Sequence, residues 1–272
     1  MRFVRLAMAG VGLLYALVVL AAWAGQRHLV YNPDPRGADP AAVGIAGLEQ
    51  RWVEAPDGVK VVAWYGRAKS GHPTLLYFHG NSGNLERRAE RFRRFMAQGW
   101  GIYMMAYRGY SGSGGVPSET GNVADARRAY ADLVSTGVAA RDLVLYGESL
   151  GSGVATQVAV DSPASGLILD APFTSITDIG ESRYPYLPVR LFLTHRYETI
   201  RVIGQVRMPL LVVHGEADGV VPVEMGRRVF AAAAAATEPK RLLTLPGAGH
   251  TNHMRYGSFE AMVAFVEALR QR

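Results

Sequence analysis

Short apolar runs alternate with amphipathic stretches along the chain from Trp52 onward. Runs that are apolar on both faces and bounded by glycine or proline are typical of buried parallel strands, and helical periodicity between them indicates helices. The strand-like runs lie at 59–65, 74–78, 101–105, 143–146, 167–169, 210–213 and 242–245. The helix-like stretches lie at 85–98, 122–135, 150–160, 224–236 and 258–270. This order predicts an α/β fold in one domain, with a mostly parallel central sheet and helices on both faces.

Two segments interrupt the alternation. Residues 174–204 contain prolines and aromatic residues and are predicted to form a short insertion, the cap. We expect its large apolar side chains either to face a membrane or to pack the cap onto the sheet; they are Tyr184, Tyr186, Leu187, Leu191, Phe192 and Leu193. Residues 32–40 contain three prolines and are predicted to be a linker with no regular element.

The longest apolar run lies at the N-terminus. No charged residue occurs in the 21 residues between Arg5 and Arg27, and as a helix this run is about 31 Å long, close to the thickness of a bilayer's hydrocarbon core. We therefore predict that residues 1–27 are a single-pass membrane anchor and that residues 28–272 form the globular domain. Arg2 and Arg5 favour a cytoplasmic N-terminus, which places the domain outside the cytoplasm.

The same N-terminal run has a second interpretation. A basic start followed by an apolar run and the small-x-small tripeptide Ala22-Trp23-Ala24 is also typical of a signal peptide. In that case the run would be cleaved and the domain secreted. The run is longer than most signal-peptide cores, so the uncleaved anchor is the favoured prediction.

Composition narrows the possible chemistry. Of 272 residues, 49% are hydrophobic, which excludes a disordered chain. No cysteine is present, which excludes disulfides, cysteine-bound zinc and a cysteine nucleophile. No HExxH motif or histidine–aspartate cluster occurs at ligand spacing, so neither a metal nor a cofactor is expected.

The charge balance is modestly basic, with 29 arginines and lysines against 23 acidic residues. The densest basic cluster also contains Glu86 and Glu90, so we predict a solvated helix face and no nucleic-acid partner. The cluster consists of Arg87, Arg88, Arg91, Arg93 and Arg94.

A glycine-rich turn carries the strongest chemical signal. Gly147-Glu148-Ser149-Leu150-Gly151 lies between the strand-like run 143–146 and a helix-like stretch. A G-x-S-x-G motif in this context forces the serine into a strained turn and exposes its hydroxyl at the end of the strand. The pentapeptide alone is a weak signal in a glycine-rich chain, but its strand–turn–helix context makes it a strong candidate for a nucleophile.

Two later loops supply the partners that a nucleophilic serine requires. A serine hydroxyl needs a base to remove its proton, and His250 follows the strand-like run 242–245 in a glycine-rich loop. An acid must hold that histidine's tautomer, and Asp218 follows the run 210–213. Asp170, at the end of another strand-like run, is the rival acid. The chain order Ser149, Asp218, His250 is the order of an α/β-hydrolase.

The loop after the strand-like run 74–78 completes the candidate site. Its Asn81 and the helix-initiating Leu150 are predicted to donate backbone N–H groups to an oxyanion. We expect the neighbouring His79 to orient this loop through hydrogen bonds. Glu148 is expected to cap a helix, although it also lies close enough to contribute to the field at the site. His214 and His253 are expected to be structural.

Six sequence motifs resemble those of the α/β-hydrolases that carry one N-terminal membrane anchor. They are FHGNSGN (78–84), AYRGYSGSGG (106–115), YGESLGSG (146–153), LDAPFTS (169–175), HGEADGVVP (214–222) and GAGHTN (247–252). The resemblance covers about 28–272 and implies an α/β-hydrolase catalytic domain with a Ser149–Asp218–His250 triad. That group includes lysophospholipases and protein depalmitoylases. Ala106 departs from the family pattern, in which a polar Asp or Asn often precedes Tyr-Arg-Gly.

The combined prediction is a membrane-bound serine hydrolase that cleaves ester or thioester bonds of a small-molecule or lipid substrate through an acyl-enzyme. No obligate protein partner is inferable. One alternative is a serine aminopeptidase, which would need an acidic pocket for which only Glu181 and Glu198 of the cap are available. The other alternative is a catalytically silent binding module on the same fold.

Overall fold

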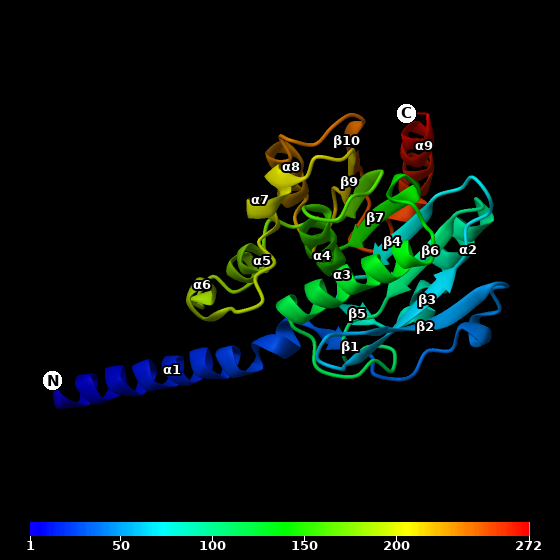
Figure 1. Cartoon of the computed structure of the whole chain (residues 1–272). Coiled ribbons are helices and arrows are strands. Elements are labelled where there is room, and N and C mark those ends of the chain that lie inside the picture. The colour runs from blue at the N-terminus through cyan, green and yellow to red at the C-terminus, as the bar shows by residue number, and fades with distance from the viewer. Residues whose placement is uncertain (272) are drawn as a thin grey trace.

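An eight-stranded sheet forms the centre of the protein in a computed structural model that describes residues 1–271 (Figure 1). Its strand order is β10-β9-β8-β7-β4-β6-β3-β2. Strand β3 pairs antiparallel with β2 and β6, and all other neighbours are parallel. The strands are β2 (Leu48–Glu54), β3 (Lys60–Gly66), β4 (Thr74–Phe78), β6 (Gly101–Met105), β7 (Leu143–Glu148), β8 (Gly166–Asp170), β9 (Leu210–Gly215) and β10 (Lys240–Leu245).

Helices cover the sheet and confirm the predicted α/β architecture. Helices α2 and α9 meet through the rings of Phe95 and Phe259, while α3 packs against α4, which lies on β7, β4 and β8. Helix α3 begins earlier than predicted because Ser118 Oγ accepts the Gly121 N–H at 3.1 Å and caps it. The helices around the sheet are α2 (Ala89–Ala97), α3 (Glu119–Ser135), α4 (Leu150–Ala159), α8 (Val223–Ala232) and α9 (Ser258–Arg270).

The burial of each strand explains which strands the sequence revealed. Every residue of β4, β6, β7 and β8 is buried, so these central strands are continuous apolar runs. Strand β2 was not predicted as an element. It is an edge strand that buries only Val53 among its seven residues, so its sequence is largely polar.

The cap joins β8 to β9 and lies beside the N-terminal helix (Figure 1). It consists mainly of the short helices α5 (Ile176–Arg183), α6 (Val189–Phe192) and α7 (Thr199–Val202). Val189 and Leu193 pack into the core, whereas Tyr186 and Leu191 are exposed. Some apolar side chains of the cap therefore pack it onto the sheet, as one of the two expectations had it, and a membrane-facing role for the exposed ones stays a prediction.

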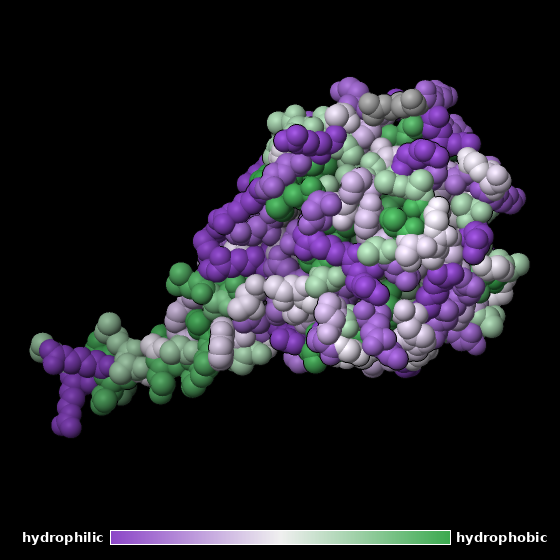
Figure 2. Space-filling view, in the orientation of Figure 1, coloured by the Kyte–Doolittle hydropathy of each residue, from purple (hydrophilic) through white to green (hydrophobic). Residues whose placement is uncertain are grey.

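A long helix, α1 (Arg2–Val30), extends away from the domain (Figure 1). Of the helices in residues 1–271, it is the one long and apolar enough to cross a membrane. Hydrophobic residues cover most of its visible surface, and hydrophilic residues are confined to its free end, where Arg2 and Arg5 lie (Figure 2). The helix continues past residue 27, and Val30 is buried against the domain.

The segment after α1 is not the linker that the prolines predicted. Asn32–Pro33 forms strand β1, which pairs in parallel with β5 (Ser82–Gly83). The Asn32 N–H donates to Asn81 O at 3.0 Å, and Tyr31 is almost completely buried. Strand pairing thus fixes the end of α1 to the loop that follows β4.

Candidate active site

Ser149 occupies a tight turn between β7 and α4. Its backbone φ is 51° and its ψ is −118°, a conformation that is strained for a residue with a side chain. The turn requires the flanking glycines. A Cβ at Gly151 would lie 1.9 Å from Phe78 O, and one at Gly147 would lie 2.4 Å from Gly151 O. The motif therefore folds as the sequence predicted, with strand and helix packed closely around the serine.

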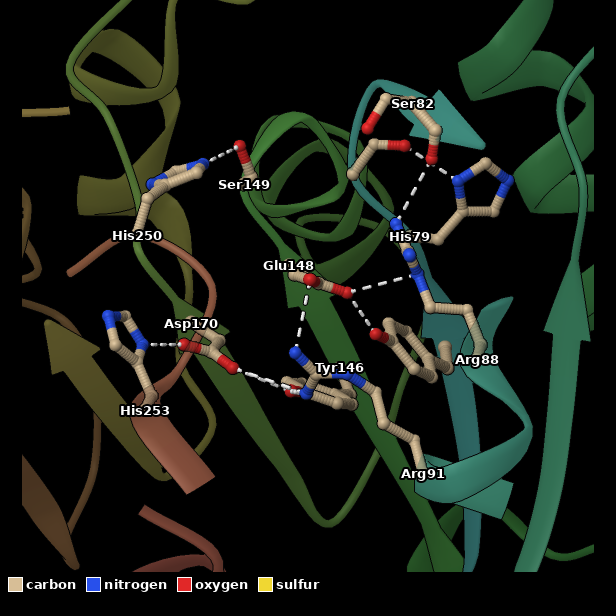
Figure 3. Close-up of polar contacts among 12 residues, drawn as sticks. His79, Ser82, Arg88, Arg91, Tyr146, Glu148, Ser149, Asp170, His250 and His253 are labelled. Atoms are coloured by element: carbon tan, nitrogen blue, oxygen red, sulfur yellow. Dashed lines mark hydrogen bonds and ion pairs between the residues drawn. The ribbon is translucent and has the colours of Figure 1, made fainter. Parts of the chain in front are cut away.

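The structure brings Ser149, His250 and Asp218 into one hydrogen-bonded row. Ser149 Oγ lies 2.9 Å from His250 Nε2 (Figure 3). His250 Nδ1 lies 2.7 Å from Asp218 Oδ2. Histidine is thus positioned to accept the serine proton on one nitrogen while its other nitrogen is held by a carboxylate.

Asp218 is held as a carboxylate. Burial by itself would raise its pKa, but hydrogen bonds from His214, His250 and the Val221 N–H outweigh burial and hold the pKa well below its usual range. Its Oδ1 accepts the N–H groups of Val220 and Val221, each at 2.8 Å. An ionised, fixed carboxylate keeps the His250 ring oriented and stabilises the positive charge that the ring gains when it takes a proton.

The two predicted oxyanion donors lie beside the serine. Leu150 begins α4, so its N–H has no acceptor within the helix. No acceptor for the Asn81 N–H occurs in the described part of the chain either. Both residues line the same cavity as Ser149 and His250. Two unpaired N–H groups next to a serine suit the negative oxygen of a tetrahedral intermediate.

His79 supports the oxyanion loop and is not a second base. Its ring is buried, and burial together with the charge of Arg88 lowers its pKa to about 4, so the ring is neutral at pH 7. His79 Nδ1 lies 2.7 Å from Gly80 O, and Tyr107 donates to His79 O at 2.8 Å. These contacts fix the backbone that leads into Asn81.

An apolar cavity of about 440 Å³ opens above Ser149 and His250. Its walls come from the cap, from the Val220–Val221 loop and from α1. The contribution of α1 to the cavity was not predicted from the sequence. Among the described residues that line the cavity, Arg183 is the one arginine, none is a lysine, and none is acidic. In residues 1–271 no three histidine, aspartate or glutamate side chains are grouped to hold a metal ion.

Asp170, the rival acid, belongs to a different cluster. Asp170 Oδ1 lies 2.5 Å from His253 Nδ1, and Asp170 Oδ2 accepts from Tyr146 at 2.7 Å (Figure 3). Arg91 approaches the same carboxylate at 3.5 Å. The structure therefore places Asp218, and not Asp170, on the catalytic candidate His250.

The prediction of a solvated arginine face is wrong for Arg88 and Arg91. Both side chains point inward and pair with the buried Glu148, at 3.6 Å and 3.0 Å (Figure 3). Arg93 and Arg94 do lie on the surface, where they pair with Glu90. The partner of the two buried arginines is far away in sequence, so local charge spacing did not reveal it.

Glu148 is likewise not a helix cap. It is buried at the end of β7 and accepts a hydrogen bond from Tyr77 as well as the two arginine contacts. Burial alone would raise its pKa, but Arg91 and Arg88 lower it to about 2. Glu148 therefore stays ionised, its charge is balanced by the two arginines, and these contacts hold the end of β7 directly before Ser149.

We expect the pair of Asp170 and His253 to stabilise the fold in a defined pH window. Burial would lower the pKa of His253, but the hydrogen bond and charge of Asp170 raise it, so its contribution is complete below about pH 6.5 and is lost as pH rises through the folded-state pKa. The pKa of Asp170 is lowered to about 2, so its contribution is present above about pH 4 and is lost as pH falls toward 2.

His253→Gln tests this window. We expect it to lower the free energy of unfolding by about 3 kcal/mol at pH 5.5, the cost of breaking a buried pair, and by less at pH 9. Urea denaturation of both proteins at the two pH values measures the difference. His72→Gln is the control, because the ring of His72 forms no ion pair in the described part of the chain and its hydrogen bond is to the backbone Ser70 O. An equal loss at both pH values would mean that folding does not raise the pKa of His253.

Known proteins similar to this chain include hydrolases. A family model described as serine aminopeptidase S33 matches residues 70–202. An uncharacterized protein of Mycobacterium tuberculosis is 37% identical over 90% of this chain and 87% of its own length. The lysophosphatidylserine lipase ABHD12 of Danio rerio is 32% identical over 67% of this chain and 53% of its own length.

Solved structures share the fold at low sequence identity. A Pyrococcus furiosus esterase superposes with a TM-score of 0.68 at 17% identity, covering 88% of this chain and 98% of that one. A puromycin-hydrolyzing peptidase of Mycobacterium tuberculosis gives a TM-score of 0.63 at 21% identity, covering 82% of this chain and 39% of that one. At these identities the likeness is one of fold.

Proposed function

The chain belongs to the α/β-hydrolase superfamily and is a hydrolase, and on that premise we propose that it is a serine hydrolase that cleaves carboxylic esters. The observation that carries the proposal is the row from Ser149 Oγ to His250 at 2.9 Å and from His250 to Asp218 at 2.7 Å. Serine, histidine and an ionised aspartate in this order are the parts that acyl transfer needs.

Each residue has a defined step in this proposal. His250 Nε2 takes the proton of Ser149 as Oγ attacks the ester carbonyl, and Asp218 stabilises the charged ring. The N–H groups of Asn81 and Leu150 bind the oxyanion, each contributing about 3 kcal/mol to lowering the barrier. His250 then gives its proton to the leaving alkoxide. Water attacks the acyl-enzyme by the same route and releases the acid.

The cavity favours an ester with an apolar acyl group over a peptide with a free amino terminus. An aminopeptidase needs an acidic group to bind the substrate's ammonium. The two acidic residues of the cap that the sequence offered are engaged elsewhere: Glu181 pairs with Arg190 at 2.6 Å and Glu198 with Arg201 at 2.9 Å. The peptidase stays the second candidate, because the matching family model and one structural neighbour are described as peptidases.

The proposal places the protein at a membrane. Helix α1 would be a single-pass anchor with a cytoplasmic N-terminus and an extracytoplasmic domain, and cleavage as a signal peptide is the alternative. The apolar exposed surface of α1 and the similarity to ABHD12, described as a lysophosphatidylserine lipase, both support a lipid or acylated substrate. Thioesters belong to the same proposed class, because the triad chemistry is common to both.

Burst kinetics with two substrate classes test the proposal. With p-nitrophenyl butyrate we expect an initial release of one p-nitrophenol per enzyme, followed by slower turnover, because an acyl-enzyme forms. Alanine p-nitroanilide should react at least about 100-fold more slowly in kcat/KM, because its ammonium would be buried without a partner. Faster hydrolysis of the anilide would identify a peptidase. Failure of both substrates would support the catalytically silent module.

A further inference from the structure

The last turns of α1 form part of the cavity that contains Ser149. Ala22, Gln26, Leu29 and Val30 all line this cavity. Their spacing of three or four residues places them on one face of the helix. The segment that the sequence assigns to membrane attachment therefore also contributes a wall to the candidate active site.

A single glutamine fastens this wall to the cap. Gln26 is only 7% exposed, although it ends an otherwise apolar stretch. Its Oε1 accepts the Thr194 N–H at 2.8 Å and the Thr194 hydroxyl at 3.0 Å. Its Nε2 donates to Phe192 O at 3.3 Å. A helix that served only for attachment would not need a buried polar side chain bonded to the cap, so α1 and the cap form one unit here.

The end of α1 is also bonded to the oxyanion loop. Asn81 Nδ2 donates to Val30 O at 3.1 Å, and the Asn32 N–H donates to Asn81 O at 3.0 Å. The residue whose N–H faces the predicted oxyanion is thus held by the last residue of the helix and by the strand after it. These two bonds fix the position of the α1 wall of the cavity relative to the oxyanion loop beside Ser149.

The cap also contacts α1 within the apolar stretch of the helix. Tyr15 donates to Tyr186 O at 2.8 Å, and Tyr15 lies eleven residues before Gln26, about 16 Å along the helix. Tyr186 and Leu191 of the cap are 63% and 83% exposed. Figure 1 shows α6 of the cap close to α1. If the part of α1 around Tyr15 lies in a bilayer, Tyr186 of the cap lies in the same layer.

We propose that the cavity is an acyl-chain site whose wall is the anchor helix itself, so that the acyl chain of a membrane ester reaches Ser149 along α1 without crossing water. This inference rests on the proposed ester hydrolase function and adds to it the place where the acyl chain binds and the route by which it arrives. The wall residues are apolar apart from Gln26, whose polar atoms are satisfied by the cap. Each methylene buried against such a wall strengthens binding by about fourfold.

Enlarging the wall residue Ala22 tests the inference in the full chain, inserted in phosphatidylcholine nanodiscs. Ala22→Trp fills the cavity from the helix side. We expect kcat/KM for the p-nitrophenyl ester of a four-carbon acid to stay within about twofold of wild type, and that of the twelve-carbon acid to fall by more than tenfold, as expected when two or more methylenes lose their site. Ala22→Leu should give an intermediate loss, which separates a graded narrowing from misfolding.

The matched control is Ala24→Trp, which places the same bulk on the exposed side of α1 away from the cavity. It should leave both esters unchanged. If Ala22→Trp keeps the wild-type chain-length profile, or Ala24→Trp shifts it equally, the helix is not a wall and the inference is overturned while ester hydrolysis stands. If wild type hydrolyses neither ester, the proposed function itself fails and the inference fails with it.

Discussion

Ser149→Ala is expected to lower kcat for p-nitrophenyl butyrate by about 10⁴–10⁶-fold, because no other group can form the acyl-enzyme. Residual turnover would come from the oxyanion donors acting on bound substrate and water. The fold should be unchanged, since alanine adopts the turn at φ 51° at least as readily as serine does. Steady-state rates together with a thermal melt of each protein measure the two effects separately.

Ser152→Ala is the matched control for that substitution. Ser152 is a fully buried serine in α4, the helix that begins directly after Ser149, and its hydroxyl has no hydrogen-bond partner in the described part of the chain. Its removal should leave the rate within about threefold of wild type, because it leaves no other polar group unpaired. A Ser149→Ala protein that kept more than a few per cent of the wild-type rate would exclude the serine mechanism.

Asp218→Asn is expected to lower kcat by about 10⁴-fold while substrate binding changes little. The amide cannot stabilise a charged histidine, and it favours the tautomer of His250 that cannot accept the serine proton; a comparable change in a serine protease has an effect of this size. Asp170→Asn should lower kcat less than tenfold, because Asp170 contacts His253 and not His250. Rates are compared below the melting temperature of each variant, since Asp170 is part of a buried ion pair.

The opposite ranking of the two aspartates would move the triad acid to Asp170. That outcome would require His250 to change its partner when substrate binds. Equal small effects would instead indicate that neither carboxylate orients the base. The two variants therefore test the assignment that the structure makes by distance, in which Asp218 Oδ2 lies 2.7 Å from His250 Nδ1.

The sequence predicted the parts of the site that depend on local structure. The elbow around Ser149 and the loop with Asp218 follow fully buried strands, and the His250 loop follows the half-buried β10. The carboxyl ends of parallel strands meet at one edge of a sheet. Strands such as Thr74–Phe78 were located to the residue because they are buried on both faces. The edge strand Leu48–Glu54 was missed because one buried position gives no apolar pattern.

What the sequence did not predict depends on contacts between distant residues. Arg91 and Glu148 are 57 residues apart, and Gln26 and Thr194 are 168 residues apart. A charged residue in a helix with nearby glutamates looks solvated until its true partner is known, which is why Arg91 was assigned to the surface. A glutamine near the end of an apolar helix gives no signal that it is buried. Such contacts become visible only when the sheet has placed the segments together.

The contact between α1 and the cap connects the N-terminal helix to the wall of the candidate active site. If the run were cleaved after Ala24, Gln26 and Val30 would stay with the domain, but Ala22 and the Tyr15 contact would be lost. The two interpretations of the N-terminus therefore differ in the cavity as well as in location. A cleaved form would have a cavity that is open on one side.

Covalent labelling with a fluorophosphonate, followed by peptide mapping in a mass spectrometer, tests the central claim most directly. A phosphonate reacts only with a nucleophile that a base has activated, and it mimics the acyl transfer step. The account predicts one adduct per chain, on the peptide and at the residue Ser149, with no labelling in Ser149→Ala and strongly slowed labelling in His250→Ala. An adduct at another residue, or unchanged labelling of Ser149→Ala, would contradict it.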